Sequence, residues 1–232
     1  MVKEGLEKRY ERHGRIKPCG LNRPDIFALG KIIQATFNKP EIDRFFRIST
    51  TLNHTRVFSN SIDQLLSLNE LGDRVTDLSF WIEGWDQKTR FDKNILLDFS
   101  KYSIQLSVEG TDPVWVFDKY NNIIKYLKSK TTWYWPIILM EKVIIFLITI
   151  LLIINLFIAV KMGNHFYHLD KFGLLAVWIF LVFYDTRRIW PYANIRLKED
   201  KILWSKENVV MLVMILVVIM AIFGGTVIPL MG

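Results

Sequence analysis

Two histidines, His165 and His168, come closest to the spacing of a metal site. They lie three positions apart on an expected turn, and Asp170 is the nearest carboxylate. Two imidazoles and one carboxylate make a poor zinc site, because zinc prefers four ligands. The single cysteine, Cys19, excludes a paired-cysteine metal or redox centre. We expect no bound metal and assign the two histidines to interfacial packing.

Catalytic motifs give no stronger signal. The sequence has no GxxxxGK[ST], GxGxxG, GxSxG or HExxH pattern, and its serines and aspartates form no recognisable nucleophile–base arrangement. We therefore expect no cofactor and no catalytic residues. A membrane enzyme without a recognisable motif is kept as an alternative function.

Three tryptophans, Trp81, Trp85 and Trp115, form the candidate binding surface. Trp81 falls on the face of its expected strand opposite to Phe80 and Ile82. An exposed tryptophan on a sheet face marks a binding surface, whereas a covering helix would bury it. We favour the covered arrangement for Trp81.

Charged residues end one apolar segment and form a candidate lipid-headgroup or gating site. Asp185 and Arg188 are three positions apart, a spacing that allows an ion pair on a helix. Arg187 and Arg188 would lie among lipid headgroups, with membrane anchoring as the simplest role.

Small and polar residues mark the candidate contacts between membrane helices. Gly224 and Gly225 lack side chains, so they allow two helix backbones to approach closely. Asn155 is the one strongly polar residue in an otherwise apolar run. The glycines are equally well explained as the frayed end of a helix.

The elements that would position these residues are mixed in the first half of the chain. Alternating apolar residues predict strands over residues 78–83, 95–99 and 104–109, the last two forming a hairpin. Helix-start signals and apolar periodicity predict helices over residues 22–37 and 112–130. Two shorter strands and a short helix are expected between them. This order predicts an α+β domain, a small antiparallel sheet with helices on one face.

The distribution of charge divides the chain into three parts. Residues 1–20 are polar and lack an apolar stretch, so we expect a flexible basic arm rather than a signal peptide. Residues 21–131 form the cytosolic α+β domain, and residues 132–232 form a helical membrane domain. The net charge of +7 is spread along the chain, which makes nucleic acid an improbable partner.

The membrane domain is predicted to cross the bilayer three times, over about residues 137–160, 166–184 and 209–230. Residues 143–160 and 209–232 carry no charge and are long enough to span a hydrocarbon core of about 30 Å. The middle segment has a shorter charge-free run, residues 172–184. Two spans with an interfacial middle helix are therefore the alternative.

Positive charge favours the three-span arrangement. Basic residues collect on cytoplasmic loops. With three spans, ten basic residues face the cytoplasm, and only Lys161 and Lys171 face outside. The ten are Lys119, Lys125, Lys128, Lys130, Arg187, Arg188, Arg196, Lys198, Lys201 and Lys206. We expect a multi-pass protein of a bacterial inner membrane, with its N-terminus cytoplasmic and its C-terminus outside.

This architecture suggests a membrane-anchored sensor or effector, in which a cytosolic binding domain is coupled to a membrane helix bundle. Such a bundle would form an oligomeric pore or perturb the inner membrane, as some phage-defence effectors of this general shape do; that analogy rests on architecture alone. The expected partners are membrane lipids, further copies of the chain, and a cytosolic protein or small-molecule signal. A non-enzymatic scaffold that recruits a cytosolic partner is the second alternative.

Overall fold

The computed structural model describes residues 8–35, 37, 42–68, 71–75, 77–86, 91–162, 175, 178–179, 190–197, 209 and 212–213. The chain divides into two compact units. The first comprises residues 1–133 and 191–199, and the second comprises residues 134–190 and 200–232. The division lies close to the predicted boundary at residue 131, but the first unit also takes a segment from the second half of the chain.

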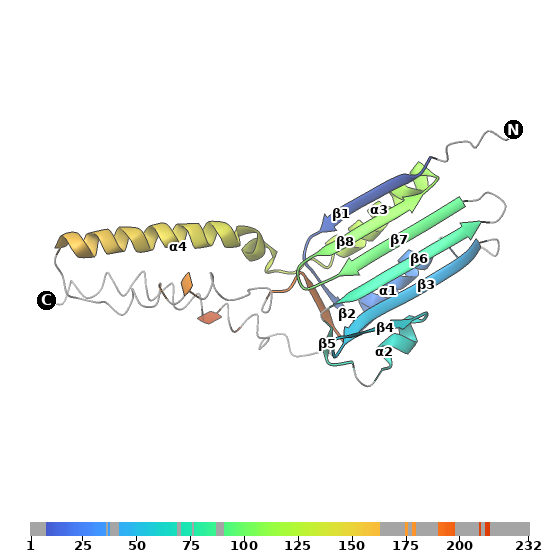
Figure 1. The fold of residues 1–232 in the computed structure, drawn as a ribbon, viewed down its shortest axis with the longest axis horizontal. Helices are drawn as coiled ribbons and strands as arrows, with labels where there is room; N and C mark the ends of the chain where they lie inside the picture. The colour runs from blue at the N-terminus through green and yellow to red at the C-terminus, as the bar shows by residue number, and fades with distance from the viewer. Residues whose placement is uncertain are drawn as a thin grey trace. The chain divides into compact units, whose positions relative to one another are not determined.

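Six antiparallel strands form the main sheet of the first unit, in the order β1-β8-β7-β6-β3-β4 (Figure 1). Their bounds are β1 Tyr10–Ile16, β3 Ile42–Leu52, β4 Thr55–Ser59, β6 Leu78–Asp86, β7 Phe91–Phe99 and β8 Ile104–Gly110. The α+β prediction is therefore confirmed.

Strict alternation of apolar and polar residues determines the pairing of the central strands. Phe80, Leu97 and Leu106 face one side of the sheet and are at most 1% exposed. Phe80 pairs with Leu97, and Leu97 pairs with Leu106, so the buried side chains lie side by side across three strands. A register shift of one residue would turn all of them to the other face, so this pattern specifies the pairing.

Helices α1 (Arg23–Gln34) and α3 (Pro113–Lys128) cover the apolar face of the sheet (Figure 1). Helix α1 begins with a reciprocal cap, in which Asn22 and Asp25 each accept a hydrogen bond from the other's backbone N–H. Asp112 caps α3 by accepting from the Val114 N–H, and Pro113 takes the first helical position. The short helix α2 (Ile62–Leu66) adds three buried side chains to the same core.

Strand β1 corrects the prediction of a flexible arm over residues 1–20. Tyr10–Ile16 pairs with β8 from Tyr10 opposite Gly110 to Ile16 opposite Ile104. Its helix-facing side carries Gly14, where a Cβ would lie only 2.3 Å from the Tyr120 hydroxyl, and Arg12, whose guanidinium lies 4.7 Å from the Phe117 ring centroid. Because these positions hold a glycine and an arginine, β1 has no alternating apolar pattern to recognise.

A second, three-stranded sheet joins distant parts of the chain. Its order is β2 (Cys19–Asn22), β9 (Ala193–Arg196) and β5 (Arg74–Val75). Strand β9 runs parallel to β2 and antiparallel to β5. Residues 193–196 were predicted as part of a loop between two apolar segments, so β9 is a further correction. Strand β9 is buried in the core of the first unit, since Ile195 is only 1% exposed.

In the second unit, the structure describes helix α4 (Trp135–Met162), 28 residues long. Among the described residues, no single unbroken helix has both the length and the apolar character needed to cross a membrane. Two stretches of α4, Trp135–Val143 and Ile145–Ile154, meet those requirements together but are bent by 42°. The Thr149 hydroxyl donates to the Ile145 carbonyl and accepts a 2.8 Å hydrogen bond from Nε1 of Trp178.

Candidate functional site

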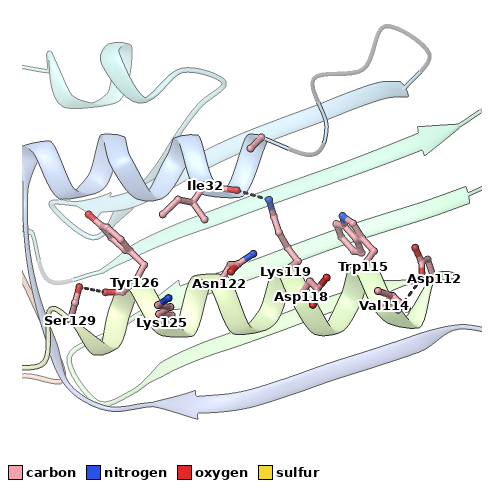
Figure 2. A pocket seen from close by; sticks show the side chains of 11 residues that line it. Ile32, Asp112, Val114, Trp115, Asp118, Lys119, Asn122, Lys125, Tyr126 and Ser129 are labelled. Carbon is pink, nitrogen blue, oxygen red and sulfur yellow. Dashed lines mark hydrogen bonds between the residues drawn. The ribbon is translucent and has the colours of Figure 1, made fainter.

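A groove of about 870 Å³ lies between α1 and α3, on the side of the helices away from the sheet core. Helix α3 supplies most of its lining, and the C-terminal half of α1 supplies the rest (Figure 2). The lining residues are Ile32, Ala35, Asp112, Val114, Trp115, Asp118, Lys119, Asn122, Lys125, Tyr126 and Ser129. This groove is the concave site that the described residues offer to a small molecule.

Lys119 is the most unusual side chain of the groove. It is only 5% exposed, and its ammonium donates to the Ile32 carbonyl at the end of α1 (Figure 2). The last carbonyls of a helix have no partner within the helix, so this bond stabilises the end of α1. Burial, with a smaller contribution from the positive charge of Lys93, lowers the pKa of Lys119 to about 8. At neutral pH the groove therefore keeps a buried positive charge.

Trp115 lines the same end of the groove. The Trp115 ring lies edge-on to Phe37, with 5.9 Å between the two ring centroids. The Lys93 ammonium lies 4.9 Å from the centroid of the Trp115 ring. Nε1 of Trp115 is buried and has no hydrogen-bond partner among the described residues. A buried donor without an acceptor is costly, so this N–H is an unusual feature of the groove wall.

The opposite ends of the two helices are joined by a polar cluster around Asp25. Lys130 lies 2.7 Å from Oδ1 of Asp25, and the Tyr126 hydroxyl donates to the same carboxylate at 3.2 Å. Burial opposes ionisation of Asp25, but the Lys130 ammonium and the Asn22 N–H outweigh it and lower the pKa of Asp25. Burial and the adjacent Asp25 raise the pKa of Tyr126 to about 12.

The groove thus combines donors with carboxylates and supports binding of a small polar molecule. Lys119 and Lys125 are donors in its lining, while Asp112 and Asp118 are acceptors. The Lys119 ammonium is already bonded to a backbone carbonyl, which favours a binding role over a nucleophilic one.

The other face of the main sheet carries a second group of functional candidates. Arg47 is its centre, with its guanidinium 4.8 Å from the Phe45 ring centroid, 5.1 Å from Phe58 and 5.5 Å from Trp81. Nε1 of Trp81 donates to Oδ1 of Asn94 at 3.1 Å. We call this group, Phe45, Arg47, Phe58 and Trp81, the Arg47 cluster.

The three predicted tryptophans do not form one surface. Trp81 and Trp85 lie on the Arg47 side of the sheet, since residues 81 and 85 alternate with buried Phe80 and Ile82, while Trp115 lies on the helix-covered side. The preference for a helix covering Trp81 is also wrong, because α1 and α3 both lie on the opposite face (Figure 1). Trp85 is 45% exposed.

Several predicted site residues lie outside the described residues. These are His165, His168, Asp185, Arg187, Arg188, Gly224 and Gly225. Asn155 lies within α4. Across the part of the chain that is described, no group of three metal-ligating side chains comes together.

Comparison of the chain with known protein families, with curated proteins and with solved structures finds no match.

Sequence reasoning overlooked Arg47 and Lys119. The alternation of Phe45 and Arg47 within a predicted strand was a usable signal, because residues two apart share a strand face. Lys119 had no comparable signal: its burial depends on α1 approaching α3, which the local sequence does not specify.

Proposed function

We propose that the chain is a membrane-anchored sensor or effector. Its first unit binds a cytosolic signal, with the groove between α1 and α3 as the candidate site. Its second unit forms a helical membrane bundle whose assembly opens a pore or perturbs the membrane.

The observation that carries the proposal is the position of Cys19. It pairs with Ala193 on one side and forms a bridge with Thr131 on the other. The chain passes from the first unit to the second just after Thr131 and returns just before Ala193. Both connections are therefore fixed to one strand of the domain, so a movement of the domain is transmitted to the segments that follow.

The same pairing supports three membrane spans over two. If residues 137–160 cross the bilayer, β9 can reach β2 only after the chain has crossed back. The segment 166–184 must then be a second span rather than an interfacial helix. The last apolar segment, residues 209–230, would be the third span and would take the C-terminus outside.

Exposed apolar side chains support lipid contact along α4. Leu139 is 65% exposed, Phe146 is 63% exposed and Phe157 is 69% exposed. A helix that is apolar on all sides needs either a protein core or a lipid environment. The hydrogen bond from Trp178 to Thr149 is of the kind that holds membrane helices together.

Topology provides the first test. A reporter that is active only in the cytoplasm should be active at the N-terminus and silent after Gly232. Activity at both ends would overturn the three-span arrangement.

Membrane activity provides the second test. Expression of the full chain should lower the membrane potential of the host cell, and Gly224→Leu should weaken this effect by crowding a close helix contact. Equal insertion of the wild type and the variant is the control. A chain that inserts with the expected topology but leaves the potential unchanged would contradict the effector function.

A scaffold is the second candidate function, and the Arg47 cluster favours it. Phe58 is 53% exposed and Phe45 is 39% exposed on an uncovered sheet face. A scaffold would leave the membrane potential unchanged and would lose a specific cytosolic partner when Phe58 is replaced by serine.

A further inference from the structure

We propose that the uncovered face of the main sheet is the interface of a two-fold dimer, in which two copies of this chain pack sheet against sheet. The face is defined by side chains of β1, β8, β7, β6, β3 and β4 that point away from α1 and α3. The partner is a second copy of the chain.

The apolar content of this face exceeds what a solvent-facing sheet needs. Four large apolar side chains on it are more than a third exposed: Phe45, Phe58, Trp85 and Leu96. Trp81 lies among them and is half-buried. Neighbouring exposed apolar side chains of this kind mark interaction surfaces.

Charged side chains of both signs are spread over the face, and they include Arg15 on β1 and Glu83 on β6. Arg47 and Arg56 lie on β3 and β4 and have aromatic contacts but no carboxylate partner among the described residues. Asp98 and Glu109, on β7 and β8, likewise have no basic partner among those residues. Among the described residues, Glu11 on β1 has polar contacts with His13 and Ser107, neither of which is a lysine or arginine. A second copy turned by 180° would bring Arg47 on β3 over strand β8 of the other copy, which carries Glu109.

The strand register makes the face complementary to itself. One row of side chains crosses five strands in the order His13, Ser107, Leu96, Trp81, Arg47. A two-fold axis parallel to the strands and passing between β6 and β7 lays Leu96 of each copy over Trp81 of the other. The same operation lays β8 over β3, so Arg47 faces Ser107 and the neighbouring Glu109 of the other copy.

The choice of this axis rests on the proposed function. A two-fold axis parallel to the strands keeps the strand directions of both copies the same. The turn between β7 and β8 is bonded to the re-entering chain, because the Tyr192 N–H donates to the Lys101 carbonyl at 3.0 Å. Both copies therefore present their membrane connections at the same end, as one shared membrane requires.

The size of the face suits a stable dimer. Six strands of five to eleven residues, at a spacing of about 4.8 Å, cover at least about 650 Å² in one copy. Two such faces bury about 1,300 Å², within the range of about 1,200–2,000 Å² for specific interfaces. Sheets packed in this way lie about 10 Å apart, with their side chains interdigitated.

Cross-linking in membranes tests the interface with little background. The native chain has one cysteine, Cys19, which is 0% exposed and whose pKa is raised to about 12 by burial and by Asp25. Such a thiol reacts slowly with maleimides. Leu96→Cys in the full-length chain should give a covalent dimer with a short bifunctional maleimide. Asn121→Cys, exposed on α3 in the helical layer, is the matched control and should stay monomeric.

A charge exchange tests the register. In the Leu96→Cys background, Arg47→Glu should weaken dimerisation by about tenfold, and Glu109→Arg should weaken it by a similar factor, because each puts like charges together. The double variant should recover the wild-type cross-linked fraction, which a general loss of folding would not allow. The proposal would be overturned if the Leu96→Cys chain stayed monomeric or cross-linked to a different protein. It would also be overturned if the double variant did not recover the wild-type cross-linked fraction.

The outcome is separable from that of the membrane experiments. A cross-linked dimer that leaves the membrane potential unchanged would contradict the effector function and keep the interface. A change in membrane potential together with a monomeric Leu96→Cys variant would contradict the interface and keep the effector function.

Discussion

Asp25, in the first turn of α1, forms an ion pair of 2.7 Å with Lys130, which lies between the end of α3 and the start of α4. Asp25 also completes the cap of α1 and accepts a hydrogen bond from Tyr126. One carboxylate therefore ties the start of α1 to the segment that leaves the domain. The Gly20 N–H reinforces this connection by donating to the Lys130 carbonyl at 2.9 Å.

Replacement of Asp25 tests the strength of this connection. Asp25→Ala removes a helix cap, an ion pair and an acceptor for Tyr126, so we expect the free energy of unfolding to fall by about 2 kcal/mol. Denaturant unfolding of the solubilised full chain, followed by tryptophan fluorescence, would measure it. Asp118→Ala, on the surface of α3, should change stability by less than about 0.5 kcal/mol. Equal effects of the two substitutions would contradict the role of Asp25.

The buried Lys119 predicts a rise in stability with pH. Its pKa is about 8 in the folded chain and near 10.5 when exposed, so between these values the unfolded chain binds more protons. Stability should then increase by up to about 1.4 kcal/mol for each pH unit above 8. Cys19 acts in the opposite direction above pH 9, because its pKa is about 12 in the folded chain and 9.0 when exposed. Tyr126 does the same above pH 10, because its pKa is about 12 in the folded chain and 10.0 when exposed.

Unfolding measured at intervals from pH 8 to pH 10 checks this prediction. Lys119→Met should flatten the profile over that range, because methionine has no proton to lose. A profile that is the same in the wild type and in Lys119→Met would show that another group titrates there.

A pair of neighbouring residues on β8 tests which face of the sheet forms the core. Leu106 is 1% exposed on the helix-covered side, and Gln105 is exposed on the other side. Leu106→Asp should destabilise the domain by about 4 kcal/mol or more, because it buries an unpaired charge. Gln105→Asp should leave the melting temperature nearly unchanged. Comparable losses from both substitutions would contradict the assignment of the faces.

Strand β9 should be replaceable by a peptide. A fragment of residues 8–133 retains β2 and β5 but leaves the place between them empty. A synthetic peptide of residues 190–199 should bind there and raise the melting temperature by a few degrees at saturation. A peptide of the same composition in scrambled order is the control. If both peptides have the same effect, pairing with β9 does not stabilise the domain.

The central strands were predictable because their local pattern is unambiguous. Over residues 78–82, 95–99 and 104–108 of β6, β7 and β8, every second residue is apolar and buried, so their positions and the direction of their side chains were predictable from the sequence. Strand β1 was overlooked because Gly14 and Arg12 fill its inner side through contacts with α3, which no local pattern encodes. Strand β9 is only four residues long and pairs with β2, more than 170 positions earlier in the sequence.

The candidate sites were likewise predictable only where residue type or local pattern reveals them. Trp81 and Trp85 were found from their residue type, but their relation to Arg47 depends on the register between β3 and β6. The groove forms where α1 and α3 meet, and its key side chain, Lys119, lies in an ordinary amphipathic stretch. Contacts between distant elements, rather than local propensity, create both sites.

Strand β9 also imposes an order on synthesis. The ribosome completes residues 10–133 long before it reaches Ala193, so β2 and β5 must wait without β9 between them while the intervening apolar segments emerge. The domain reaches its final stability only when the returning chain fills the space between them. A chain whose residues 193–196 fail to return to this place would expose the open edges of β2 and β5 to proteases.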